Sequence, residues 1–279
     1  MSLADVRGRT AVVTGAASGI GFALAERFVA DGASVVLADI EEPALHEATE
    51  TLRERGGRVT AVVTDVSDGA AVDHLATAAV EAFGPVHILC NNAGVGAGGP
   101  IAQLRHEDWE WVLGVNLWGV IHGLRAFLPS MLEHGEPGHI VNTASLAGHI
   151  AGPFMAPYSA SKFAVVGISE ALFHELQITE AAIGVSVLCP GWVNTKIHDS
   201  DRNRPSGAAE HRPDGEVSAE MLRQTLAAGM DPAEVARLVS LAILDGTFHV
   251  FTHPEMSPAI EARMRAILAS ENPRLTMEI

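Results

Sequence analysis

The chain has 279 residues, 48% of them hydrophobic and 19% charged, which is the composition of a soluble globular protein. Its 34 acidic and 18 basic residues give a formal net charge of −16, so we expect neither nucleic acid nor an anionic membrane as a partner. No apolar run reaches the roughly 18 residues that a membrane-spanning helix needs.

Short apolar runs and helical patterns alternate along the first half of the chain. The apolar runs predict strands at residues 10–14, 34–38, 58–64 and 87–90. The segments between them predict helices at residues 20–30, 43–55 and 70–83. A glycine-rich turn joins the first strand to the first helix.

The second half continues this alternation. It holds a long, mostly helical region at 106–132, a strand at 139–143, a helix at 158–182 and a strand at 185–189. Charged residues, Gly and Pro gather after the last of these strands, and we interpret residues 192–226 as a surface lid. Asp231-Pro232 and Ser257-Pro258 each predict the start of a further helix.

Nearly continuous apolar strands separated by helices indicate a parallel sheet that is covered on both faces. Right-handed crossovers then give a single doubly wound α/β sheet, the Rossmann fold. No linker or repeat divides the chain, so we expect one domain over residues 1–279.

The compartment is expected from the N-terminus and the cysteines. MSLADVRGRT lacks the apolar core of a signal peptide. Cys90 and Cys189 end two strands that should have a third between them, which is too far for a disulfide. We therefore expect a cytoplasmic protein in which both thiols behave as small buried hydrophobic groups.

The glycine-rich turn at 14–21, TGAASGIG, has the features of a pyrophosphate site. Glycines let the backbone turn tightly and approach an anion, and the following helix points its free N–H groups at it. The candidate contacts are Gly15, Ser18, Gly19, Ile20 and Gly21. A glycine turn without a ligand is the alternative interpretation.

Asp39 ends the second strand, 18 residues past Gly21. A carboxylate at this place can accept hydrogen bonds from both hydroxyls of an adenosine ribose, and it would repel a 2′-phosphate. Glu41 and Glu42 add negative charge, and the turn holds no Lys or Arg, so the sequence favours NAD over NADP. The alternative is a solvated aspartate at a strand end.

Tyr158 is the only tyrosine in the sequence, and Lys162 follows it by four residues on a predicted helix, so both side chains share one face. A free phenol is a poor base at neutral pH, and a nearby ammonium would lower its pKa. Ser145, at the end of the fifth strand, could bond a substrate oxygen at the edge of the sheet where ligands bind.

Several motifs occur in one order, each between a strand and a helix. They are TGAASGIG (14–21), NNAG (91–94), Asn116, Ser145, YSASK (158–162) and Pro190-Gly191. Together they resemble the short-chain dehydrogenase/reductase superfamily, in its subgroup with TGxxxGxG and YxxxK motifs, over residues 8 to 195. The resemblance implies an NAD-dependent oxidoreductase that interconverts a secondary alcohol and a ketone. Its NAD-binding part would span residues 8–145, and its catalytic and substrate part residues 145–279.

The resemblance also implies roles for individual residues. Tyr158 would be the general acid/base, Lys162 the group that lowers its pKa and holds the nicotinamide ribose, and Ser145 the group that orients the reacting oxygen. Asn116 would hold a water that links Lys162 to solvent, although a helix asparagine bonded to backbone is the alternative. The remaining cofactor contacts would be Asp65, Val66, Asn91, Ala93, Gly94, Pro190, Gly191, Val193 and Thr195.

The substrate is expected to be a small hydrophobic alcohol or ketone. Residues 95–99, 146–157, 192 and 196–225 should build its pocket, and their apolar members suggest a cyclic or steroid-like molecule. The candidate substrate contacts are Ser145, Leu146, Phe154, Tyr158 and Trp192. The rival functions are a non-catalytic NAD-sensing or scaffold protein on this fold, and a nucleotide-sugar epimerase or dehydratase of the extended branch.

Three further features bear on assembly and metals. Family members commonly end in a glycine-rich seventh strand, but residues 247–254 read TFHVFTHP here, so the usual tetramer is in question and we favour a homodimer through the two long helices. Trp109, Trp111 and Trp118 are interpreted as packing or interface residues. We expect no metal, although His249 and His253 could share a strand face.

Overall fold

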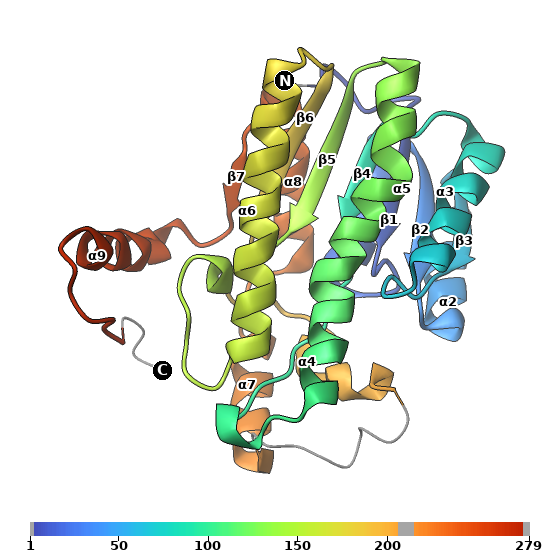
Figure 1. The fold of residues 1–279 in the computed structure, drawn as a ribbon. Coiled ribbons are helices and arrows are strands. Elements are labelled where there is room, and N and C mark those ends of the chain that lie inside the picture. The colour runs from blue at the N-terminus through green and yellow to red at the C-terminus, as the bar shows by residue number, and fades with distance from the viewer. Residues whose placement is uncertain (1–2, 206–214, 276–279) are drawn as a thin grey trace.

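The computed structural model describes residues 3–205 and 215–275, and within them seven parallel strands form one sheet in the order β3-β2-β1-β4-β5-β6-β7 (Figure 1). The strands are β1 Thr10–Thr14, β2 Ser34–Asp39, β3 Val59–Val63, β4 Ile88–Asn91, β5 Gly138–Thr143, β6 Ile183–Cys189 and β7 His249–Phe251. The predicted doubly wound sheet is confirmed, and the strand order reverses between β1 and β4.

Helices cover both faces of this sheet. The helices of the described residues are α1 Gly19–Ala30, α2 Glu42–Glu54, α3 Gly69–Phe83, α4 His106–Leu113, α5 Gly119–His134, α6 Ala156–Ile178, α7 Gly215–Ala227, α8 Pro232–Asp245 and α9 Ser257–Leu268, and α9 does not cover the sheet. Strand β1 alternates between the layers: Ala11 and Val13 pack in a core with α1 and α8, while Val12 packs in a core with α3 and α5. Both faces of the sheet are therefore apolar, as the continuous runs predict.

The region predicted as one helix at 106–132 contains a π-helical turn, Gly114–Trp118, between α4 and α5. The Gly119 N–H donates to the Gly114 carbonyl, five residues back, so the turn holds one extra residue. The continuous stretch His106–His134 is apolar and long enough to pass for a membrane-spanning helix by composition. Its α5 part packs against β4 and α3, as a core helix of this fold does.

The C-terminal part departs from the predicted pattern at β7, which ends at Phe251. The His249 ring stacks on Phe251, whereas His253 lies beyond the strand and its Nδ1 contacts the Thr252 hydroxyl at 2.7 Å. The expectation that His249 and His253 share a strand face is therefore wrong. Among the described residues no cluster of three or more His, Cys, Asp or Glu side chains could hold a metal ion.

The predicted lid begins with a short 3-10 helical segment, Lys196–Asn203, and ends in α7. Residues 206–214 of the predicted lid lie outside the described residues. Asp231 starts α8 as predicted, because its carboxylate accepts a hydrogen bond from the Ala233 N–H. Ser257-Pro258 starts α9, which extends away from the body of the molecule (Figure 1).

Candidate active site

A cleft of about 670 Å³ runs along the carboxyl edge of the sheet, where the strand order reverses. Parallel α/β sheets bind their ligands at this edge. The predicted site residues that line the cleft are Gly15, Ser18, Gly19, Ile20, Gly21, Asp39, Asp65, Val66, Ala93, Gly94, Ser145, Leu146, Phe154, Tyr158, Lys162, Pro190, Gly191, Trp192, Val193 and Thr195. Asn91 and Asn116 do not line it.

The glycine turn fits an anion. Gly15 has φ +66°, and a Cβ at this position would lie 2.8 Å from the Cα of Ala93, so the turn and the loop after β4 meet backbone to backbone. Ser18 precedes α1 and makes no side-chain cap, and the first turn of α1 holds no acidic residue. No side-chain cap therefore competes for the first N–H groups of α1, and they can bind the pyrophosphate of a dinucleotide.

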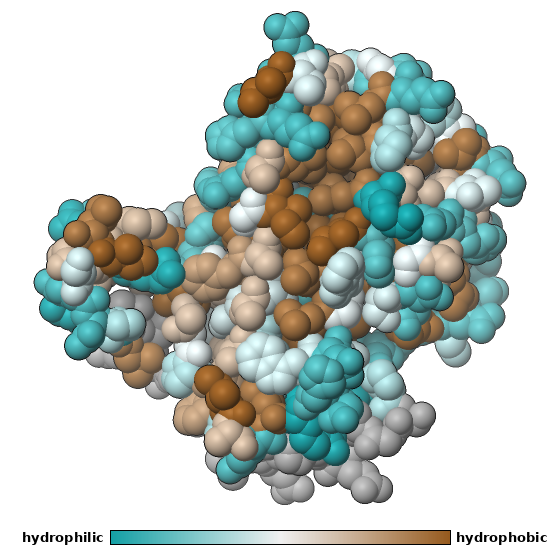
Figure 2. Space-filling view, in the orientation of Figure 1, coloured by the Kyte–Doolittle hydropathy of each residue, from teal (hydrophilic) through white to brown (hydrophobic). Residues whose placement is uncertain are grey.

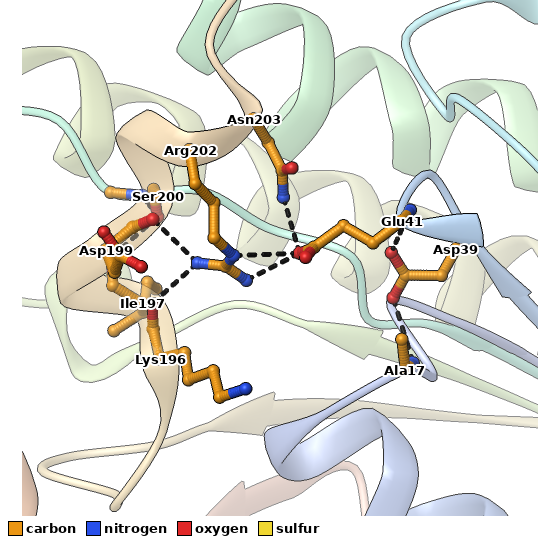
Figure 3. Close-up of polar contacts among 10 residues, drawn as sticks. Ala17, Asp39, Glu41, Lys196, Ile197, Asp199, Ser200, Arg202 and Asn203 are labelled. Atoms are coloured by element: carbon orange, nitrogen blue, oxygen red, sulfur yellow. Dashed lines mark hydrogen bonds and ion pairs between the residues drawn. The ribbon is translucent and has the colours of Figure 1, made fainter. Parts of the chain in front are cut away.

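Asp39 lies at the carboxyl end of β2, and both of its oxygens are held by backbone N–H groups (Figure 3). Ala17 donates to Oδ2 at 2.9 Å and Glu41 donates to Oδ1 at 3.0 Å. Burial raises the pKa of this carboxyl, and the two backbone hydrogen bonds oppose that rise. A carboxylate has further lone pairs on each oxygen, so Asp39 can still accept the hydroxyls of a ribose.

Tyr158, Lys162 and Ser145 converge in the middle of the cleft. Tyr158 and Lys162 lie one turn apart on α6, with the Lys162 Nζ 5.6 Å from the centre of the phenol ring. Lys162 is only 3% exposed, and its Nζ donates to the Thr143 carbonyl at 2.9 Å. Ser145 follows β5 and caps the short 3-10 helix Leu146–Gly148, where its hydroxyl accepts a hydrogen bond from the Ala147 N–H at 3.1 Å.

Burial is the main influence on the pKa values of Tyr158 and Lys162. Burial raises the pKa of Tyr158, and a hydrogen bond with the Ser145 hydroxyl offsets part of that rise. Burial also lowers the pKa of Lys162 to about 8. Ser145 is thus one neighbour that favours the phenolate, while the Lys162 ammonium one turn away donates to the Thr143 carbonyl.

Asn116 is buried on the π-helical turn and faces the loop after β4. Its Oδ1 accepts from the Val95 N–H at 2.8 Å, while its Nδ2 donates to the Val95 carbonyl at 2.9 Å and to Ser161 Oγ at 3.3 Å. A Cβ on Gly94 would lie 3.4 Å from Asn116 Oδ1 and 3.7 Å from Lys162 Nζ. Asn116 and Lys162 therefore both lie next to Gly94, and the water-holding role of Asn116 stays a prediction.

Asn91 is placed differently from the prediction, because its side chain points away from the cleft. It is buried at the end of β4, where its Nδ2 donates to Asn142 Oδ1 at 2.9 Å. Asn92 takes the cleft position instead, and its Nδ2 donates to the Thr14 carbonyl at 2.9 Å. Successive side chains on a strand face opposite sides, so only one of two adjacent asparagines can face the ligand.

The substrate end of the cleft holds a group that the sequence analysis missed. Arg204 is 4% exposed and lies over the Trp111 ring, 4.3 Å from its centre. Its Nη1 is 2.5 Å from Asp108 Oδ1, and its Nε is 2.9 Å from Asp201 Oδ1. Trp111, interpreted as a packing residue, is indeed buried, but it also lines the cleft.

Predicted substrate contacts surround this end of the cleft. Leu146 is buried, while Phe154 is 62% exposed and Trp192 is 38% exposed. Phe154 adopts φ 61°, a left-handed conformation that non-glycine residues rarely take. Its carbonyl accepts a hydrogen bond from the Gly99 N–H at 2.7 Å, which ties residues 95–99 to the loop before α6.

The chain is similar to known proteins of one family. Residues 9–206 match the family model described as short chain dehydrogenase. A short-chain dehydrogenase/reductase from Burkholderia phymatum, solved in complex with NAD, is 43% identical, with a TM-score of 0.94 over 99% of this chain and 100% of that one. A 1-deoxy-11-beta-hydroxypentalenate dehydrogenase from Streptomyces exfoliatus is 39% identical over 88% of this chain and 84% of its own length.

A third similar protein was solved with the other nicotinamide dinucleotide. It is a variant of the actinorhodin polyketide ketoreductase with NADPH, 35% identical, with a TM-score of 0.75 over 90% of this chain and 97% of that one. The matched segment contains the glycine turn, the asparagine loop and the Tyr158–Lys162 pair. The chain belongs to the short-chain dehydrogenase/reductase family of oxidoreductases.

Proposed function

We propose that this protein is an NAD-dependent oxidoreductase that interconverts a secondary alcohol and a ketone on a hydrophobic substrate. One observation carries the proposal: a phenol, a serine hydroxyl and a buried ammonium line the same cleft as a glycine turn whose helix N-terminus has no side-chain cap. Tyr158, Ser145 and Lys162 supply these three groups. A proton can thus be exchanged at one point along a bound dinucleotide.

The residues divide the proton chemistry among them. Tyr158 takes the hydroxyl proton when an alcohol is oxidised and returns it when a ketone is reduced. Ser145 holds the reacting oxygen beside the phenol, which its own hydrogen bond with Tyr158 already favours. Lys162 contributes a positive charge one turn away, in a water-poor setting where charge acts strongly. A nicotinamide bound in this cleft would supply the hydride acceptor or donor, and its oxidised form would add a positive charge to the site.

NAD is favoured over NADP because of the adenosine end of the cleft. Asp39 offers two oxygens to the ribose hydroxyls and would meet a 2′-phosphate with a like charge. The Burkholderia phymatum relative bound to NAD supports this assignment. Because the similar polyketide ketoreductase was solved with NADPH, the affinities of this protein for NAD and NADP should both be measured.

The substrate side of the cleft supports an apolar substrate. Leu146, Ile150 and Trp192 line it together with Leu226 from α7. These apolar side chains exclude water and offer few hydrogen-bonding groups to a substrate, so the size and shape of the substrate would decide whether it binds. The hydroxypentalenate dehydrogenase relative acts on a hydroxylated molecule by its name, which is consistent with this class.

Replacing Tyr158 with Phe tests the proposal. We expect turnover of NAD with the best of a panel of secondary alcohols to fall by at least about 100-fold, because general acid/base catalysis contributes on this order. NAD should still bind with similar affinity by calorimetry, since the ring and the glycine turn stay in place. Unchanged turnover in Tyr158→Phe would overturn the acid/base assignment.

A further inference from the structure

An ion pair crosses the adenosine end of the cleft (Figure 3). Glu41 Oε1 accepts from Arg202 Nη2 at 2.8 Å and from Arg202 Nε at 2.9 Å. Asn203 Nδ2 donates to the same oxygen at 2.8 Å. The pair joins the loop after β2 to the segment 195–205, which we call the strap, across 161 positions of sequence.

The pair lies directly beside Asp39. The Glu41 N–H donates to Asp39 Oδ1 at 3.0 Å, and Asp39, Glu41 and Arg202 all line the cleft. The strap starts at the glycine turn, where Thr195 Cγ2 would be 3.1 Å from a Cβ on Gly19. The strap thus runs from the pyrophosphate turn to the carboxylate proposed to hold the adenosine ribose.

Backbone carbonyls of the strap hold the Arg202 side chain in place. Its Nη1 donates to the Asp199 carbonyl at 2.7 Å and to the Lys196 carbonyl at 3.1 Å, so the guanidinium is oriented by the strap itself. Lys196 extends toward the same corner (Figure 3). Burial tends to raise the pKa of Glu41, but the hydrogen bonds from Arg202 and Asn203 and the charge of Lys196 outweigh it and lower that pKa. The carboxylate is therefore ionised and paired at neutral pH.

We propose that Glu41 is a cofactor-selectivity residue, which favours NAD over NADP by keeping Arg202 engaged. The inference deepens the proposed function and rests on it. A guanidinium is well suited to a phosphate, and this one pairs with Glu41, whose N–H donates to the carboxylate proposed to hold the ribose. Glu41 competes for that guanidinium and adds a second negative charge next to Asp39. A 2′-phosphate would have to displace the Glu41 carboxylate from Arg202, and it would be repelled by the charge of Asp39.

The test compares Glu41→Gln with Glu42→Gln, which makes the same charge change one residue along at an exposed position. NAD and NADP affinities are measured by titration calorimetry on each full-length protein. We expect the ratio of NAD to NADP affinity to fall about tenfold in Glu41→Gln and to stay unchanged in Glu42→Gln, because a freed guanidinium can make charge-assisted hydrogen bonds to a phosphate. An unchanged ratio in Glu41→Gln would overturn the inference.

The double variant Glu41→Gln/Arg202→Gln separates the two ways in which Glu41 could act. If the freed guanidinium receives the phosphate, the gain in NADP affinity disappears in the double variant. A gain that persists in full without the arginine would overturn the part assigned to Arg202. Failure of the native protein to bind either dinucleotide would instead overturn the proposed function, so the two failures can be told apart.

Discussion

Lys162 carries an ammonium into one of the most enclosed places in the protein. Burial lowers its pKa from 10.5 to about 8, and its Nζ has the Thr143 carbonyl as a partner. The unfolded chain holds this proton more tightly than the folded protein does. The burial therefore costs stability in full below pH 8, and the cost is relieved as the pH rises from about 8 to 10.5.

The variant Lys162→Met should make the protein more stable while disabling the site. We expect the free energy of unfolding at pH 7 to rise by about 1–3 kcal/mol, because the buried charge is gone and the lost hydrogen bond offsets part of the gain. Urea unfolding at pH 7 and at about pH 9.5 measures it, and the gain should shrink at the higher pH.

Lys196→Met is the matched control, because Lys196 is exposed and is the only other lysine in the sequence. We expect it to give no pH-dependent gain. A Lys162→Met protein that is less stable at pH 7, or whose gain grows with pH, would contradict the assigned cost of burial.

At this scale the sequence predicts a residue well when its chemistry is local. Gly15 and Asp39 follow from a turn and a strand end, and both line the cleft. The adjacent asparagines are harder, since NNAG does not say whether Asn91 or Asn92 faces inward. The last paired residue of β4 decides it, and a shift of one residue reverses the facing.

At the scale of elements, the strands and helices were predictable because each run of apolar residues is long enough to reveal its period. The π-helical turn Gly114–Trp118 was not, because one extra residue barely disturbs a helical pattern. That turn nevertheless buries Asn116 against the Val95 backbone. An element interpreted as a plain helix thus contains a device that positions a site residue.

The strap was the least predictable element of the site. Its composition indicates a surface segment, but its contacts join residues far apart in sequence. Arg204 pairs with Asp108 where both are almost fully buried, while Arg202 pairs with Glu41 where both remain partly exposed. We infer that the buried pair anchors the strap and that the exposed pair, being screened by solvent, is the contact that opens more readily.

At the scale of the whole molecule, two surfaces are apolar enough to suggest assembly. Apolar side chains gather between α5 and α6 on one face (Figure 2), and α5 and the turn before it expose Leu132 and Trp118 at 46% and 52%. Helix α9 extends away from the body and buries none of its residues, with Leu268 79% exposed. Patches of this kind commonly mark interfaces.

We propose a homodimer through the α5 and α6 face, the two long helices favoured from the sequence because the seventh strand departs from the family pattern. Sedimentation velocity at micromolar concentration should give a dimer, and Trp118→Asp should raise its dissociation constant at least about tenfold, because a buried aromatic anchor often dominates an interface. Leu268→Asp is the control and should leave the dimer intact. A native monomer, or a dimer broken only by Leu268→Asp, would contradict this arrangement.

The central claim, that Tyr158 exchanges the proton, can be measured directly because the sequence holds one tyrosine. An ultraviolet titration of the phenol is made on the protein alone, with saturating NAD and with saturating NADH. We expect a midpoint above the ordinary value of 10.0 for the protein alone, since burial raises the pKa of Tyr158. Saturating NAD should lower the midpoint below that of the protein alone, because its nicotinamide ring is positively charged. Saturating NADH, whose ring is uncharged, should lower the midpoint less. A midpoint that NAD leaves unchanged would contradict the account.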